Sequence, residues 1–104
     1  MKTMTEILFN YSQAISQANA LDEIAARVER VSDSDMQDAF DDLSSAWKSD
    51  SAKQYLLKGN RLCENVKKTA GDIREISNAI RRIAETTKAA EEESLRIATE
   101  RTVQ

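Results

Sequence analysis

The sequence predicts an all-α protein, an antiparallel two-helix hairpin, from three observations. The chain has 104 residues with no proline and only two glycines, so it can make few chain reversals. It is rich in Ala, Glu, Lys, Arg, Gln and Leu, which lose least on entering a helix. Only five residues are aromatic, which suits a narrow helix–helix seam better than a broad core. We expect a single domain over residues 1–104, with helices at about 4–44 and 51–98 and a corner at 45–50.

The second half of the chain has the clearest periodicity. Apolar or small residues repeat every seven positions in two series that lie three residues apart, as in a coiled-coil seam. The a series is Ala52, Gly59, Val66, Ile73, Ile80, Thr87 and Ser94, and the d series is Tyr55, Leu62, Thr69, Ile76, Ile83, Ala90 and Ile97. Both series are expected to face the first helix. An e series widens the apolar stripe and consists of Leu56, Cys63, Ala70, Ser77 and Ala84.

The first half is less regular but is also helical in pattern. Apolar residues repeat at three- and four-residue steps from Ile7 to Val31, and the pattern resumes at Met36. Residues 32–35 read Ser-Asp-Ser-Asp, and these side chains compete for backbone hydrogen bonds. One long helix is expected, with a kink or a short break at residues 32–35 left open.

The corner is predicted near Trp47, inside the one dense cluster of cap and turn residues, SSAWKSDS at 44–51. Ser49 or Asp50 can cap the second helix, and Ser51 with Gln54 has capping-box spacing. Counting back from this corner places residue i opposite about residue 95 − i. Gly59 then lies near Met36, where it would let the first helix approach closely.

The same antiparallel pairing leaves residues 91–104 without a partner inside the chain, because no residue of the first helix lies opposite them. Candidate partner-binding positions are therefore the outer e series and this overhang. They are Leu56, Cys63, Ala70, Ala84, Leu95, Ile97 and Ala98. Cys63 is expected to act as a small buried hydrophobe.

Composition argues against catalysis and against bound cofactors or metals. The chain has no histidine and one cysteine, so it offers no nucleophile–base pair and no zinc set. The acidic run at 33–42 lacks the glycine and the final glutamate of a calcium loop and is expected to be a solvated face. No segment resembles a membrane span or a cleavable signal peptide, so a cytoplasmic protein is expected, with signal-independent secretion also open.

The charge is divided between the two halves. Residues 1–46 carry nine acids and three bases, and residues 48–90 carry ten bases and five acids. Opposite charge favours pairing of the two helices with each other. The basic surplus of the second half gives only a weak case for nucleic-acid binding, because no aromatic residues or known motif accompany it, and none is expected.

The segment AWKSDSAKQY at 46–55 resembles the corner of the WXG family of small secreted helical hairpins. Trp47 matches the family tryptophan, Lys48 the variable position, and Ser49 stands where the family has glycine. The length and the central corner also agree, so the resemblance covers essentially the whole chain. Trp47 is expected to plug the corner, and it can also form a surface for a partner.

The resemblance implies a function in bacterial type VII secretion. WXG proteins act as homo- or heterodimeric four-helix bundles, and many carry an aromatic-x-x-x-acid export signal after the second helix. This chain has no aromatic residue beyond Tyr55. It is therefore more similar to the helical targeting factors that bind the N-terminal helical domain of LXG toxins. The resemblance implies such a toxin domain or another WXG-like protein as partner, and leaves a homodimer open.

The alternative interpretation is a generic cytoplasmic coiled-coil protein, structural or regulatory, in which the Trp47 match is accidental. In that case the first helix could continue through the corner and form one rod. A helix of this length would span about 150 Å, and a hairpin about half of that.

Overall fold

The computed structural model describes residues 2–103 and the side chains of residues 2–101. These residues are almost entirely helical and contain no strand, which confirms the predicted all-α class. The order of elements is α1 (Met4–Arg30), the π-helix η1 (Val31–Asp35), α2 (Met36–Ala46) and α3 (Asp50–Val103). Residues 47–49 separate α2 from α3, within the predicted corner.

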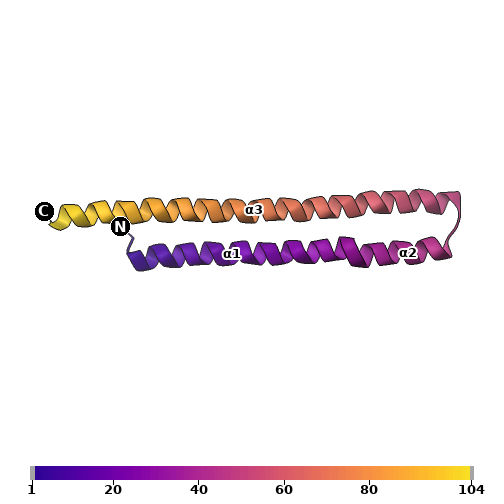
Figure 1. Cartoon of the computed structure of the whole chain (residues 1–104), viewed down its shortest axis with the longest axis horizontal. Helices are drawn as coiled ribbons and strands as arrows, with labels where there is room; N and C mark the ends of the chain where they lie inside the picture. The colour runs from indigo at the N-terminus through magenta and orange to yellow at the C-terminus, as the bar shows by residue number, and fades with distance from the viewer. Residues whose placement is uncertain (1, 104) are drawn as a thin grey trace. The chain divides into compact units, whose positions relative to one another are not determined.

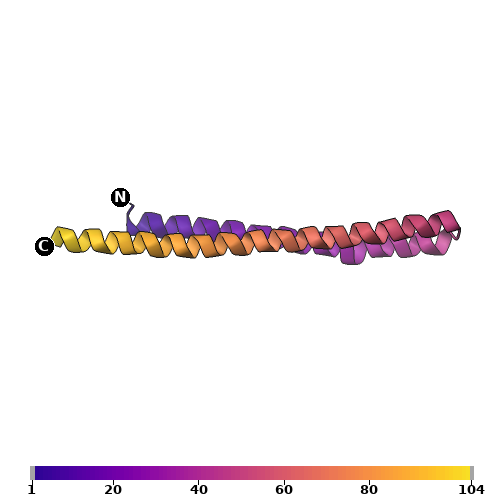
Figure 2. The same ribbon diagram turned by 90° about the horizontal axis from the view of Figure 1, so that it is seen from above.

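The chain divides into two compact units. Unit 1 combines the residues up to Leu21 with those from Glu75 onward, and unit 2 comprises Asp22–Arg74. In unit 1, the start of α1 lies beside the second half of α3 and runs antiparallel to it (Figure 1). In unit 2, the end of α1, η1 and α2 lie beside the first half of α3 in the same antiparallel way (Figure 2). Unit 2 is thus itself a helical hairpin.

The buried face of α3 differs from the predicted one. Burial or half-burial falls on the e series and on the a series up to Ile80, and the d series is exposed. The buried residues of α3 are Ala52, Gly59, Cys63, Ala70, Ser77 and Ala84. The matching buried positions of α1 and η1 are Ile7, Ala18, Ala25 and Ser32. The prediction of an a/d seam is therefore wrong: the seam is a/e, and nearly all of its buried side chains are small.

The small size of the seam residues explains why the a and e series are buried rather than the a and d series. The a and e series are separated by steps of four and three residues, so they also form a valid coiled-coil stripe. Alanine, glycine and serine at these positions let two helix backbones come close together, which increases dispersion contacts along their length. An a/d seam would place Leu62, Ile76 and Ile83 between the helices and hold the backbones further apart.

The possible break at residues 32–35 is a π-helix. The backbone N–H of Met36 donates to Val31 O, which closes the wider turn. Ser32 is fully buried there and donates its hydroxyl to Glu29 O at 3.0 Å. A π-turn inserts one extra residue into a helix without ending it.

This extra residue changes which side chains face α3. The buried positions Ala18, Ala25 and Ser32 are seven residues apart, and the next step of seven would bring Ala39 into the seam. After the π-turn, Phe40 is half-buried instead, and Ala39 is exposed. The π-turn therefore brings Phe40, rather than Ala39, toward α3.

Gly59 makes room for an aromatic side chain of the opposite helical segment in unit 2. A Cβ atom added at Gly59 would lie 2.5 Å from Phe40 Cζ, so any larger residue at this position requires the Phe40 ring to move. The nearest side chain at Gly59 is therefore that of Phe40, one helical turn beyond the predicted neighbour Met36.

Gly71 has no such constraint. It is exposed on α3, and nothing lies within 4 Å of the position that a Cβ atom would take. We therefore expect Gly71→Ala to raise the free energy of unfolding by up to about 1 kcal/mol, since alanine loses less backbone entropy in a helix. Urea denaturation followed by circular dichroism measures this change, and a loss of stability would contradict the open surroundings of Gly71.

Candidate protein-binding surfaces

The corner of unit 2 is built by local hydrogen bonds. Trp47 has extended backbone angles, φ −124° and ψ 104°, and its N–H donates to Leu43 O at 2.8 Å, which ends α2. Ser49 then caps α3: its Oγ accepts from Ala52 N at 3.1 Å and its carbonyl oxygen accepts from Lys53 N at 3.0 Å. Such a cap stabilises a helix start by about 1 kcal/mol. Of the two predicted cap residues, the structure uses Ser49.

The corner presents an exposed aromatic pair. The rings of Trp47 and Tyr55 are stacked, with centroids 5.8 Å apart and an interplanar angle of 26°. Lys58 Nζ lies 5.8 Å from the centroid of Tyr55. Trp47 nevertheless keeps 41% of its surface exposed and Tyr55 keeps 60%. Trp47 thus packs on α3 and remains available at the surface.

Four residues of α3, spaced by seven, form polar contacts with the opposite helical segment, and we call this side the charged edge. In unit 2, Lys67 Nζ lies 2.6 Å from Asp33 Oδ1, and Arg74 forms an ion pair with Glu29. In unit 1, Arg81 Nη2 donates to Asn19 Oδ1 at 2.7 Å. Lys88 Nζ lies 5.0 Å from the centroid of the Tyr11 ring.

The contacts of the charged edge orient the helices more than they stabilise them. Asp33 accepts a hydrogen bond from Lys67, and with its negative charge it raises the pKa of that ammonium group. Both side chains are more than half exposed, and exposed ion pairs contribute little to stability. Basic residues of the second half and acidic residues of the first half thus form ion pairs within the chain, at Lys67 with Asp33 and at Arg74 with Glu29.

The d series lies on the other side of the seam. At 100° per residue, the charged edge and the d series lie about 80° to either side of the seam's centre. The large d residues are exposed on α3: Tyr55, Leu62, Ile76, Ile83 and Ile97. One side of α3 is therefore polar and paired within the chain, and the other is apolar and uncovered.

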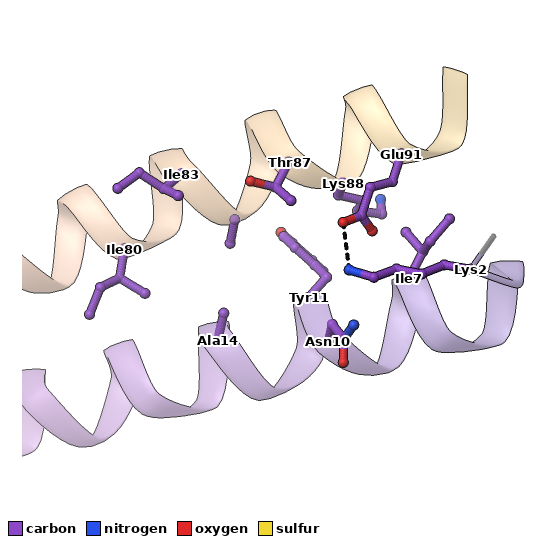
Figure 3. Close-up of a pocket in the computed structure, with 11 residues that line it drawn as sticks. Lys2, Ile7, Asn10, Tyr11, Ala14, Ile80, Ile83, Thr87, Lys88 and Glu91 are labelled. Carbon is purple, nitrogen blue, oxygen red and sulfur yellow. Dashed lines mark hydrogen bonds and ion pairs between the residues drawn. The ribbon is translucent and has the colours of Figure 1, made fainter. Parts of the chain in front are cut away.

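A groove of about 270 Å³ lies on unit 1 between α1 and α3. Its apolar walls include Ile7 and Ala14 from α1 and Ile80 and Ile83 from α3. Figure 3 shows Tyr11 and Ile80 pointing into the space between the helices. The ion pair of Lys2 and Glu91, 2.8 Å long, stands at one end of the groove.

The last turns of α3 extend past the start of α1 within unit 1 (Figure 1). Arg96 forms ion pairs with Glu93 and with Glu100, both on the same helix. Ile97 is exposed, and Leu95 and Ala98 are half-buried. The predicted overhang at 91–104 begins later than expected, because Glu91 pairs with Lys2. Beyond that pair, the described part of the overhang is a helix that carries its own salt bridges, and Gln104 lies outside the described residues.

The predicted partner-binding positions divide into two groups. Cys63, Ala70 and Ala84 are buried in the seam and Leu56 is half-buried there, so the expectation that the e series faces outward is wrong. Its place is taken by the d series, which the sequence analysis assigned to the seam. The sequence could not show whether the d series or the e series is exposed, because the residues of both series are apolar or small.

Other kinds of site find no support in the described residues. No group of three or more Cys, Asp or Glu side chains among them is placed to hold a metal ion. No described helix contains a stretch that is long and apolar enough to cross a membrane. Comparison of the chain with protein-family models, curated protein sequences and solved structures gives no match.

Proposed function

We propose that this chain is a WXG-like targeting factor, which binds the N-terminal helical domain of a type VII secreted LXG toxin and promotes its export. In such a complex the helices of the two proteins would form a four-helix bundle. The single observation that carries the proposal is the exposed, stacked pair of Trp47 and Tyr55 at the corner. Trp and Tyr are the residues most enriched among the few that dominate protein–protein binding energy.

The surroundings of this pair add support. Leu62 lies two turns beyond Tyr55 on the same side of α3 and is also more than half exposed, so apolar surface continues from the corner along the helix. Large apolar patches on a small helical protein are typical of surfaces that are covered by a partner. The extended backbone at Trp47 also argues against the alternative of a single rod.

The test is co-expression with the helical domain of an LXG-type toxin encoded beside this gene. We expect a stable complex that survives gel filtration. Trp47→Ala should weaken it by about 2 kcal/mol, roughly thirtyfold in Kd, because the ring is lost from a desolvated contact. Isothermal titration calorimetry measures the change.

Lys48→Ala is the matched control, since it changes an exposed neighbour in the same corner and should leave the affinity unchanged. Circular dichroism verifies that each variant keeps its helix content. A chain that stays folded but binds no helical protein encoded in its locus would contradict the proposal. An adjacent LXG-type toxin gene would support it.

A further inference from the structure

We infer that η1 is a conformational switch in unit 2, which buries or releases the ring of Phe40. In the packing described above, the π-turn places this ring over Gly59. In a second packing, which we call the straight form, η1 would be regular α-helix and Phe40 would leave the seam. The straight form requires a seam that accepts α2 in a new orientation, and a corner that absorbs the movement.

The chain already contains a seam for the straight form. Ala25 and Ser32 are fully buried, and the next two steps of seven residues reach Ala39 and Ala46. In a regular α-helix these four residues would form one stripe. The residues of α3 that are buried in unit 2 are also small: Ala52, Gly59, Cys63 and Ala70. The straight form would therefore continue the small-residue seam as far as the corner.

The observed packing leaves this part of the stripe unused. The structure describes every residue of α2, and none of them is fully buried. Ala39 and Ala46 are exposed, and Phe40 is half-buried. The ring fits over Gly59 because a Cβ atom there would lie 2.5 Å from it. A large side chain thus holds α2 on a seam of small residues, and little fully buried surface is lost when α2 turns.

The movement between the two forms is one residue step. In the π-turn, Met36 N–H donates to Val31 O. In the straight form it would donate to Ser32 O, as in any α-helix. The residues of α2 would turn by about 100° and shift by about 1.5 Å along the axis. Residues 47–49 lie outside both helices and can absorb this step.

The charged edge is compatible with both forms. Asp33 pairs with Lys67 in the observed packing. It follows Ser32 directly, as Asn19 follows Ala18, and the side chain of Asn19, on regular α-helix, accepts a hydrogen bond on this same edge. Asp33 would therefore keep its side and its partner in the straight form.

Opposing contributions bring the two forms close in free energy. The π-turn buries part of an aromatic ring, whereas the straight form gains regular hydrogen bonds and close contacts of Ala39 and Ala46 with α3. Two packings of one sequence with similar free energies form a switch, and π-turns inside α-helices are frequent at functional sites. A partner that binds the released ring would select the straight form.

Fluorine NMR of the full chain labelled with 4-fluorophenylalanine tests the inference. The chain has two phenylalanines, and Phe9, which is 59% exposed, is the internal reference for a solvated ring. Gly59→Ala should keep the helix content and move the Phe40 signal to a solvated environment, with a solvent isotope shift close to that of Phe9. Saturation transfer on the unsubstituted chain should reveal a minor signal at the same position. Gly71→Ala is the matched control and should leave the Phe40 signal in place, because it meets open space.

Deletion of Ser34 removes the choice between the two forms. With one residue fewer, Phe40 lies seven residues after Ser32 in a regular α-helix, so the packed ring needs no π-turn and Ala39 leaves the stripe. The deletion variant should be folded and show only the packed Phe40 signal. In urea denaturation, Gly59→Ala should raise its unfolding constant at least about tenfold more than that of the unsubstituted chain. Gly71→Ala should have equal effects on both.

Four results would overturn the inference. A Phe40 signal that stays packed in Gly59→Ala means that the ring only shifts within one packing. An unsubstituted chain without the minor signal has no accessible straight form. Equal effects of Gly59→Ala with and without Ser34 mean that no second packing relieves the contact, and an unfolded deletion variant means that the π-turn is not one extra residue in a regular seam. All four concern the free chain, so they are independent of the toxin partner, whose test uses Trp47.

Discussion

Ala70→Glu is expected to lower the free energy of unfolding by about 3 kcal/mol or more, whereas Thr69→Glu should change it by less than about 0.5 kcal/mol. Ala70 is fully buried in the seam of unit 2, where a carboxylate would lose its water and the larger side chain would force the helices apart. Thr69 belongs to the d series and is exposed. Substitutions at these two neighbouring residues therefore distinguish a seam that contains the a and e series from one that contains the a and d series.

Urea denaturation of the two variants, followed by circular dichroism at 222 nm, measures both changes. Each variant adds the same charge one residue apart on the same helix, so net charge is matched. The difference in helix propensity between alanine and threonine is below about 0.7 kcal/mol, much less than the expected difference between the variants. If Thr69→Glu were the more damaging substitution, the seam would contain the d series, and the arrangement of α3 described above would be wrong.

Gly59→Leu is expected to lower the free energy of unfolding by about 2 kcal/mol, despite the gain of up to about 1 kcal/mol from removing a helical glycine. The first side-chain atom would already lie 2.5 Å from Phe40 Cζ. The ring must therefore move, and the helices of unit 2 must separate or the ring must leave the seam.

Gly71→Leu is the control, because the same substitution there meets open space and should be neutral or stabilising. A double-mutant cycle with Phe40→Ala gives a second check. Gly59→Leu should cost less when the ring is absent, and the coupling energy should exceed about 0.5 kcal/mol. Strict additivity of the two substitutions would show that Phe40 does not lie over Gly59.

Much of the fold could be predicted from the sequence because the relevant physics is local. The lack of proline, the seven-residue spacing of apolar residues and the Ser49 cap each act within a few residues along the chain. They predicted an all-helical protein with a corner at Trp47. A contact from the first helix at Gly59 was also predictable, because a glycine at a seam position has few other uses inside a helix.

The candidate surfaces were less predictable. The a, d and e series of α3 are all apolar or small, so the helix has two adjacent stripes with equally good spacing. Which stripe is buried depends on the opposite helix, where Ala18, Ala25 and Ser32 favour a close, small-residue contact. The exposure of the d series of α3 became visible only with that contact.

The sequence alone determined that this chain is helical, that it turns at Trp47, and that it has more apolar surface than two helices need. Only the tertiary structure decided which part of that surface remains free, because burial is a relation between residues far apart in the chain. The π-turn at η1 illustrates the same limit. One extra residue moves Phe40 over Gly59, a consequence that no local pattern in residues 31–35 predicts.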